Sequence, residues 1–276
     1  MSESPKLSSH QQRWLTGVFI GLPVLACIAL GPSWGWYILV SCVATIGLWE
    51  LHGLFFPVTL CAKWKVFSFA AGLYIPFAAF LWGSAGLSLA LVACLFAAFS
   101  LTVFSSPLNS EEISRIAALV LCWLYVPYLL SYVLLIGAAP QGRFWILFVL
   151  AVIVAGDAGA FYTGLRMGRH KLHQIVSPKK TIEGAIGGLV FSVVTGSILG
   201  LIFFRNVPLF KLLFFGFLIA ITGQIGDLIE SMIKRNSGKK DSSSLLPGHG
   251  GILDRLDSHL FAFPVMWALL KWAALD

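Results

Sequence analysis

The polar segment from Gln224 to Ser258 carries the residues most suited to chemistry in this chain. It holds five of the twelve acidic residues of a sequence in which only 11% of residues are charged, and apolar segments lie on both sides. Ionisable groups are costly near a bilayer, so a cluster of this density predicts a functional site. Its charged members are Asp227, Glu230, Asp241, Asp254 and Asp257, together with Lys234, Arg235, Lys239, Lys240 and Arg255.

Two pairs of carboxylates in this segment are each spaced three residues apart. They are Asp227 with Glu230 and Asp254 with Asp257. This spacing places the members of a pair on one face of a helix. Carboxylate oxygens suit Mg²⁺, which usually takes one or two of them and shares its other positions with substrate phosphates. The spacing therefore predicts a magnesium site for a phosphorylated substrate.

Each carboxylate also has a structural interpretation, and the sequence leaves these alternatives open. Glu230 could form an ion pair with Lys234 one helical turn later. Asp254 and Asp257 could cap the N-terminus of a helix and compensate its dipole. The glycine-rich segment PGHGG at residues 247–251 offers backbone N–H groups to an anion, and His249 could contact a phosphate. Residues 242–244, all serine, are expected to form a flexible linker.

A second candidate element is the segment SPKKTIEG at residues 177–184. Ser177 followed by Pro178 resembles a helix N-cap with proline at the first helical position, which would place Lys179 and Lys180 in the first turn. Cations at that position oppose the helix dipole unless an anion binds there too. The segment therefore predicts phosphate binding, and a positively charged cytoplasmic loop is the alternative.

A third candidate is Asp157, which stands inside an apolar run between Gly156 and Gly159. Carboxylates within membrane spans often mark ion or substrate pathways. Structural pairing with a neighbouring helix is the alternative. Glu50 and His52 lie near the end of another apolar run, where an interfacial position is expected. No residue before 141 by itself indicates an activity.

The composition indicates an all-α, polytopic integral membrane protein that must position these groups. Of 276 residues, 58% are hydrophobic, and the mean hydropathy is +0.87. At roughly 20 apolar residues for each spanning helix, about nine spans are predicted. They lie near residues 14–31, 34–56, 66–83, 85–104, 115–137, 144–165, 185–204, 209–230 and 254–274. The third and fourth could instead be one long bent helix.

The distribution of basic residues predicts the orientation of the chain. The lysine- and arginine-rich loops 57–65, 166–183 and 231–253 fall on one side of the membrane, which marks that side as cytoplasmic. A net charge of +7 suits an anionic membrane surface or a phosphorylated substrate, and nucleic acid is not expected as a partner. The five cysteines form no CxxC and are expected to be packing residues. The first apolar run is expected to be a retained span.

The string SMIKRNSGKKDSSSLLPGHGGILDRLD resembles the signature of the phosphatidate cytidylyltransferases, also called CDP-diacylglycerol synthases. SPKKTIEG and the segment around Asp157 are similar to family features too, so that the resemblance covers about residues 150–264. The signature spans residues 231–257, with Ser231, Lys234, Arg235, Lys240, Asp241, His249, Gly250, Gly251, Asp254, Arg255 and Asp257 at its matching positions. Ile182 and the pair Phe161–Tyr162 depart from the pattern without changing a charged group.

The resemblance implies that CTP and phosphatidate react to give CDP-diacylglycerol and pyrophosphate in phospholipid biosynthesis. It also implies Mg²⁺ dependence, with Asp227 and Asp254 as metal ligands in a centre that can include K⁺, and a homodimer. The catalytic residues implied are Asp227, Asp254, Asp241, Asp257, Lys240 and His249. The substrate-binding residues implied are Ser177, Lys179, Lys180, Thr181, Glu183, Ser231, Lys234, Arg235, Lys239, Gly250, Gly251, Arg255 and Asp157.

The chain is thus expected to divide into helices 1–140, a scaffold and candidate dimerisation region, and a catalytic region 141–276. The expected location is a bacterial-type inner membrane, with membrane lipids as partners and the site facing the cytoplasm. Two other functions remain open at this point. An ion-coupled transporter would use Asp157 and Asp227 as a pathway. A lipid kinase that uses CTP as phosphoryl donor would yield a lipid phosphate instead of a liponucleotide.

Overall fold

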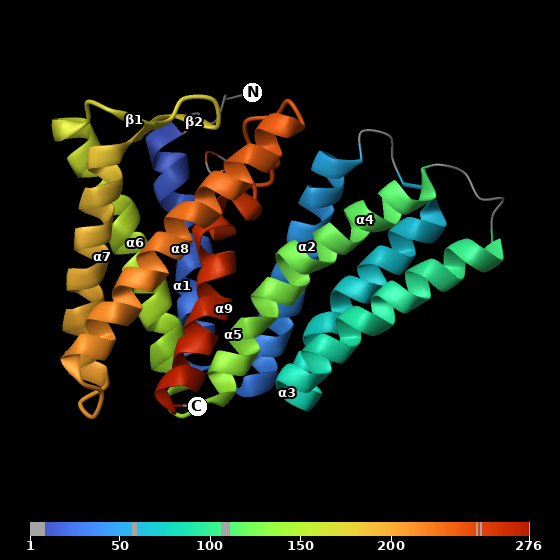
Figure 1. Cartoon of the computed structure of the whole chain (residues 1–276), viewed down its shortest axis with the longest axis horizontal. Coiled ribbons are helices and arrows are strands. Elements are labelled where there is room, and N and C mark those ends of the chain that lie inside the picture. The colour runs from blue at the N-terminus through green and yellow to red at the C-terminus, as the bar shows by residue number, and fades with distance from the viewer. Residues whose placement is uncertain (1–8, 57–59, 106–110, 247, 249, 276) are drawn as a thin grey trace, which may run out of the picture.

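The structure, a computed structural model, describes residues 9–56, 60–105, 111–246, 248 and 250–275 (Figure 1). Helices make up nearly all of it, and two short strands form an antiparallel hairpin between α6 and α7. The elements are α1 (Ser9–Leu30), α2 (Ser33–Phe55), α3 (Ala62–Ser105), α4 (Glu112–Trp123), the π-helix η1 (Leu124–Tyr128), α5 (Leu129–Ala138), α6 (Gly142–Met167), β1 (Lys171–His173), β2 (Ser177–Thr181), α7 (Ile182–Phe203), α8 (Leu209–Asn236) and α9 (Leu253–Ala273).

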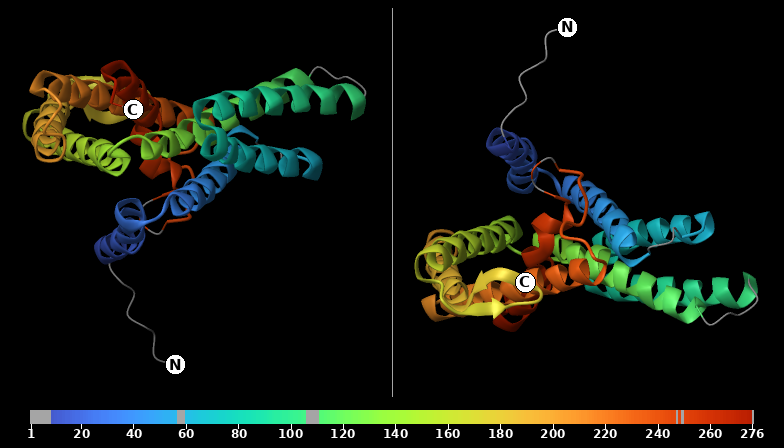
Figure 2. Two further views of the ribbon diagram at one scale, coloured as in Figure 1. Left: turned by 90° about the horizontal axis from the view of Figure 1, so that it is seen from below. Right: turned by 90° about the horizontal axis from the view of Figure 1, so that it is seen from above.

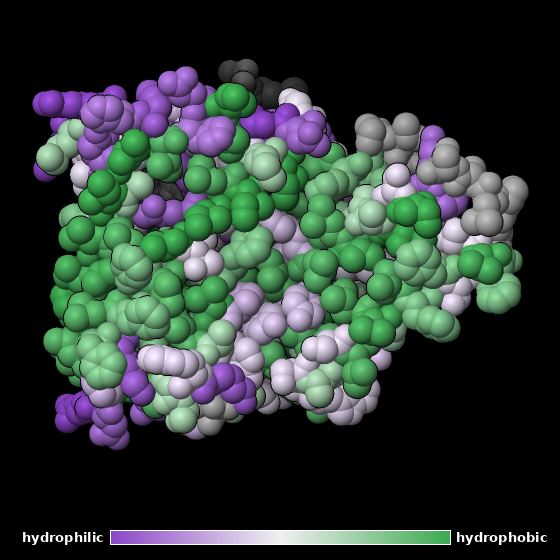
Figure 3. All heavy atoms as spheres, in the orientation of Figure 1, coloured by the Kyte–Doolittle hydropathy of each residue, from purple (hydrophilic) through white to green (hydrophobic). Residues whose placement is uncertain are grey.

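Six helical segments among the described residues are long and apolar enough to cross a membrane. This fits the prediction of an integral membrane protein, and the finer count of about nine spans stays a prediction. The six are Ser33–Phe55, Ala62–Phe104, Glu112–Ala138, Gly142–Met167, Ile182–Phe203 and Leu209–Asn236. Hydrophobic residues form a broad band across the molecule. Hydrophilic residues gather mainly at the end that carries β1, β2 and the end of α8, and a smaller group lies at the opposite end (Figure 3).

The long helix α3 contains the break that its sequence indicated. Gly83 has φ of 63° inside α3, a conformation that side chains other than glycine rarely adopt. Figure 1 shows the chain turning back there, so that the predicted spans 66–83 and 85–104 form two arms. The views from below and above show that these arms and α4 extend away from the group formed by α6, α7, α8 and α9 (Figure 2).

Helices α6 and α7 pack closely because small residues line their contact. Buried glycines recur every fourth residue along α7 at Gly184, Gly188, Gly196 and Gly200, and Ser192 takes the intervening place. The Ser192 hydroxyl donates a 2.8 Å hydrogen bond to the Val152 carbonyl of α6. Lipid supplies no hydrophobic driving force between helices, so close backbone approach of this kind holds spanning helices together.

The end of α2 lies inside the protein, contrary to the interfacial position expected for Glu50 and His52. Their exposed fractions are 2% and 8%. His52 Nε2 lies 2.9 Å from the Ser68 hydroxyl of α3, which also accepts the indole N–H of Trp123. The expectation was wrong because α3, α4 and the segment before α9 cover this end of α2, which position along the span alone does not reveal.

Gly188→Ala is expected to destabilise the bundle. The new Cβ would lie 2.8 Å from the Gly156 carbonyl oxygen and 3.0 Å from the Ala160 Cβ, so α6 and α7 would have to move apart. The free energy of unfolding should fall by about 1–3 kcal/mol, measured as a lower thermal unfolding midpoint in detergent. Gly21→Ala is the matched control, since no atom outside its own helix backbone lies within 4 Å of the Cβ. Equal losses in both variants would contradict the packing argument.

Candidate active site

The SPKKTIEG segment forms a strand before it forms a helix. Residues 177–181 make up β2, which pairs with β1 so that Lys171 lies opposite Thr181. Helix α7 begins at Ile182, and its N-cap is Thr181, whose hydroxyl accepts a 3.1 Å hydrogen bond from the Gly184 N–H. The predicted N-cap at Ser177 was wrong, because pairing with β1 takes the residues before Thr181 and a second capping hydroxyl stands later in the segment.

Glu183 fastens the base of this hairpin. Its carboxylate lies 2.6 Å from His170 Nδ1 and accepts backbone hydrogen bonds from Arg169 at 3.0 Å and His170 at 3.2 Å. Three contacts of this kind hold the hairpin against the first turn of α7. Glu183, predicted to bind substrate, is therefore engaged in positioning β1 and β2 over the end of the bundle.

Lys180 of β2 points to a cavity of about 460 Å³ at the polar end of α6, α7 and α8. Its ammonium pairs with the Asp227 carboxylate of α8. Five predicted site residues from three elements, α6, β2 and α8, meet here. The lining comprises Asp157, Lys179, Lys180, Thr181 and Asp227, with Gly156, Ala160, Phe161, Gly164, Leu165, Leu172, Gly184, Ala185 and Gln224. Two lysines beside two carboxylates suit a ligand that carries phosphates and a bound cation.

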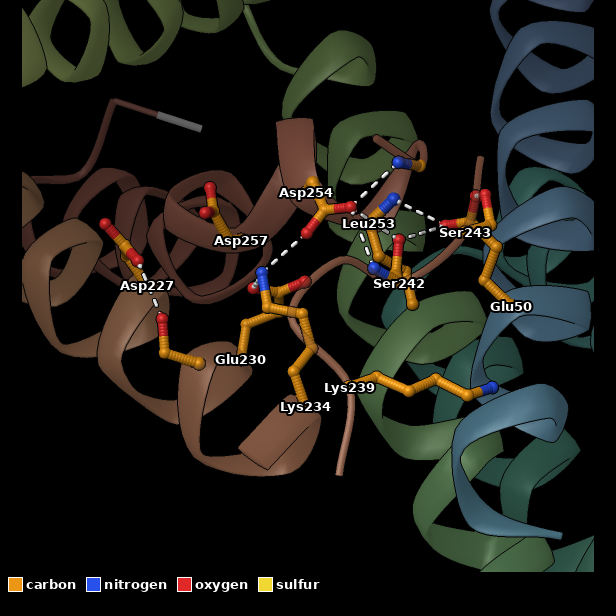
Figure 4. A network of polar contacts seen from close by, with 12 residues as sticks. Glu50, Asp227, Glu230, Lys234, Lys239, Ser242, Ser243, Leu253, Asp254 and Asp257 are labelled. Carbon is orange, nitrogen blue, oxygen red and sulfur yellow. Dashed lines mark hydrogen bonds and ion pairs between the residues drawn. The ribbon is translucent and has the colours of Figure 1, made fainter. Parts of the chain in front are cut away.

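A buried ion cluster connects α8 to α9 beside this cavity (Figure 4). The Lys234 ammonium lies 2.5 Å from Asp254 Oδ1 and also pairs with Glu230. The i, i+4 ion pair of Glu230 with Lys234, one of the alternatives from the sequence, is confirmed. All three side chains are at least nine-tenths buried. Two carboxylates share one lysine, so removal of the lysine would leave both uncompensated.

Asp254 is occupied by donors on both of its oxygens. Oδ2 accepts from the Gly251 N–H at 2.7 Å and from the N–H and hydroxyl of Ser242, both at 2.9 Å. Asp254 lies in the first turn of α9, as the dipole-compensation alternative requires, but the N-cap is Ile252 and has no side-chain cap hydrogen bond. Hydrogen bonds from Lys234 and two backbone N–H groups thus compensate for the water that the buried Asp254 carboxylate loses.

Glu50 of α2 contacts the same segment from the opposite side, as Figure 4 shows. Its carboxylate accepts hydrogen bonds from the hydroxyls of Ser242 and Ser243 and from the N–H groups of Ile252 and Leu253, at 2.6–3.0 Å. The expectation that residues 242–244 form a flexible linker was therefore wrong for the first two serines. Sequence analysis missed Glu50, although the rule applied to Asp157, that a carboxylate in an apolar run is functional, would have found it.

The other predicted site residues divide into those with internal partners and those at the surface. Ser231 lies 3.4 Å from Asp227 through its hydroxyl, and Asp257 accepts the Ser258 N–H at 2.7 Å. Gly250 has φ of 76°, and its carbonyl accepts the Leu246 N–H at 2.8 Å. His249 lies outside the described residues. The exposed residues are Arg235, Lys239, Lys240, Asp241 and Arg255, of which Lys239 donates to the Gly53 carbonyl at 2.7 Å.

The two carboxylates predicted as metal ligands differ in how well they fit Mg²⁺. Within the described ranges no group of three or more His, Cys, Asp or Glu side chains is placed to hold a metal. Mg²⁺ needs only one or two carboxylates when phosphates and water complete its shell. Asp227 fits this role, since it lines the cavity with 23% of its side chain exposed. Each carboxylate also has a lysine partner that a cation would replace, Lys180 for Asp227 and the buried Lys234 for Asp254.

Comparison with known families covers almost the whole chain. The family model described as "Cytidylyltransferase family" matches residues 11–273 of this chain. This match extends well beyond residues 150–264, which carry the resemblance in the sequence. The chain belongs to the cytidylyltransferase family.

Several bacterial relatives of this family carry the name phosphatidate cytidylyltransferase. The Staphylococcus saprophyticus protein is 40% identical over 150 residues, which cover 54% of this chain and 58% of that protein. The Bacillus subtilis protein is 37% identical over 163 residues, 59% and 61% of the two chains. A Staphylococcus aureus protein is 38% identical over 183 residues, 65% and 68%. The alignments thus span less than two thirds of the first two relatives.

Lys234→Ala is expected to destabilise the protein far more than loss of an exposed lysine. Removing one partner of a buried ion cluster leaves its charges uncompensated and costs about 3–5 kcal/mol. The measurement is the unfolding free energy of the full chain in detergent. Lys240→Ala, in the exposed part of the same segment, is the control and should change it by less than about 0.5 kcal/mol. Similar stabilities for the two variants would rule out the buried cluster as the connection between α8 and α9.

Proposed function

We propose that this chain transfers a cytidylyl group from CTP to phosphatidate and releases pyrophosphate, giving CDP-diacylglycerol. The observation that carries the proposal is the cavity that joins the Lys180–Asp227 pair to Lys179 and Asp157. Membership of the cytidylyltransferase family and the names of the bacterial relatives support the choice of nucleotide and lipid.

The reaction requires alignment and charge neutralisation more than proton transfer. An ionised phosphate oxygen of phosphatidate forms a bond to the α-phosphorus of CTP, and the bond from that phosphorus to the pyrophosphate oxygen breaks. Lys179 and Lys180 would hold phosphates from the hairpin side. The exposed Arg235 at the end of α8 and Lys239 and Lys240 in the loop before α9 would hold them from the other side. Holding both reactants in line is the main source of rate in such a step.

Mg²⁺ is the cofactor proposed for this site. Asp227 would hold it, with Asp254 as the second ligand implied by the family signature. Bound Mg²⁺ would neutralise negative charge on the triphosphate and on the departing pyrophosphate. Asp254 can serve only if Lys234 gives up its place, and a K⁺ ion in the same centre remains part of the proposal.

The proposed setting is a bacterial inner membrane with the polar end at the cytoplasmic face, where CTP is available. About nine spans and a homodimer belong to the same proposal. The apolar wall of the cavity, with Phe161, Leu165 and Leu172, supports entry of the acyl chains from the side. The position of the charged groups at one end of the helices speaks against a transport pathway through the middle.

Radiolabelled CTP tests the reaction and separates it from the kinase alternative. With purified full-length protein, phosphatidate and Mg²⁺, label in the α-phosphate of CTP should pass to the lipid phase, and label in the γ-phosphate should leave as pyrophosphate. In a parallel reaction with diacylglycerol in place of phosphatidate, transfer of γ-label to the lipid would show a lipid kinase. Absence of lipid label from either form of CTP would refute the proposed function.

Asp227→Asn is expected to abolish cytidylyl transfer in a protein that still folds. The change removes the charge that pairs with Lys180 in the cavity and the best-placed carboxylate for Mg²⁺, and roughly a hundredfold loss or more is expected. The assay is formation of CDP-diacylglycerol per folded molecule. Glu111→Gln, an exposed change before α4, is the matched control and should keep full activity. Near-normal turnover by Asp227→Asn would remove Asp227 from the mechanism.

A further inference from the structure

Glu50 makes the densest set of contacts between the N-terminal helices and the signature segment. It is 2% exposed near the end of α2. Oε1 accepts from the Ser243 hydroxyl at 2.6 Å and the Ile252 N–H at 2.9 Å. Oε2 accepts from the Leu253 N–H at 2.8 Å and the Ser242 hydroxyl at 3.0 Å. All four donors come from the segment that leads from α8 into α9.

These contacts satisfy two needs at once. A buried carboxylate is costly unless hydrogen bonds compensate for the water it loses. The first N–H groups of a helix have no partner within the helix, and here Ile252 and Leu253 at the start of α9 donate theirs to Glu50. A negative charge at that end is also favourable to the helix dipole. The buried charge of Glu50 is therefore compensated only when α9 begins at Leu253 with its first N–H groups directed at the carboxylate.

The hydroxyl of Ser242 continues the connection to Asp254. It lies 3.0 Å from Glu50 Oε2 and 2.9 Å from Asp254 Oδ2, so the two carboxylates share the single proton of one buried hydroxyl. Asp254 in turn contacts Lys234 at 2.5 Å. Gly251 completes the close approach, because a Cβ there would meet the Ser242 hydroxyl and the Glu50 carboxylate. A continuous set of contacts thus runs from α2 to the end of α8.

We propose that Glu50 is a positioning residue for the transfer reaction, acting through Ser242 on Asp254 and Lys234. It does not line the cavity that contains Asp227, so its effect on turnover comes from the placement of the segment before α9. The effect of Glu50 on turnover rests on the proposed function, cytidylyl transfer. This proposal assigns a role in the reaction to a residue of helices 1–140, which were expected to serve as a scaffold and candidate dimerisation region.

Kinetics of three variants of the full chain test the proposal. Glu50→Gln should lower kcat per folded molecule by roughly tenfold to a hundredfold. This is the range typical of residues that orient a metal-binding side chain through a hydrogen bond. The KM for CTP should change less than kcat, because the lysines of the cavity remain. A purely structural role would instead lower the yield of folded protein and leave both constants of the folded fraction unchanged, which would overturn the proposal.

Ser242→Ala and Ser243→Ala form a matched pair that decides the matter even if Glu50→Gln does not fold. Each removes one hydroxyl that contacts Glu50, but only the hydroxyl of Ser242 also contacts Asp254. Ser242→Ala should lower kcat severalfold, and Ser243→Ala should stay within about twofold of the unmodified protein. Equal kcat values for the two variants would contradict transmission through Ser242.

Hydrogen exchange separates failure of this inference from failure of the proposed function. Residues 250–256 should take up deuterium faster in Glu50→Gln than in the unmodified protein, or in Ser242→Ala if Glu50→Gln does not fold, and α7 should be unchanged. Unchanged exchange in residues 250–256 would overturn the positioning role whatever the enzyme does. If the unmodified protein forms no CDP-diacylglycerol, the proposed function fails, and the exchange result still decides whether Glu50 fixes the start of α9.

Discussion

The burial of Lys234 between Glu230 and Asp254 is the interaction on which the arrangement of the polar end depends. A lysine in this position has lost its water and needs both carboxylates, and each carboxylate needs the lysine. Glu230 and Lys234 lie one turn apart on α8, whereas Asp254 begins α9. The pairing therefore fixes the start of α9 against the end of α8. Residues 237–252 must then fold back so that Asp254 reaches Lys234.

The same constraint gives the two predicted metal ligands different surroundings. Asp227 has a lysine from the hairpin as its ionic partner and faces a cavity that a phosphorylated ligand can enter. Asp254 faces inward, where backbone N–H groups, a serine and Lys234 occupy its oxygens. Asp227 and Asp254, both predicted as metal ligands, thus differ in the structure. Asp227 lines the cavity, whereas Asp254 is enclosed by the residues that lead into α9.

The sequence was sufficient to predict a helical membrane protein, the polar segment and the meeting of distant charges. Apolar runs of spanning length predict helices wherever they occur, and the break at Gly83 lies at a glycine beside a serine. The cap of α7 was misplaced because two hydroxyl residues in one short segment are both suitable caps, and only the pairing of β1 with β2 selects Thr181.

Glu50 shows what local patterns cannot supply. Its four donors lie about two hundred residues later in the chain, and no periodicity connects α2 with the start of α9. Ser242 and Ser243 likewise resemble a linker until a buried acceptor is placed beside them. Residues whose role is set by a partner far along the chain become visible only once the helices are packed, and charge in an apolar span is the one signal that points to them beforehand.

The most direct test of the central claim is to locate the bound nucleotide. A photoreactive azido analogue of CTP, irradiated with the purified protein and Mg²⁺ and followed by peptide mapping, should label residues 157–185 or the end of α8 around Asp227. Excess CTP should prevent that labelling. Labelling confined to the opposite end of the bundle, around Arg205, would contradict the account, because it would place the nucleotide away from the Lys180–Asp227 pair.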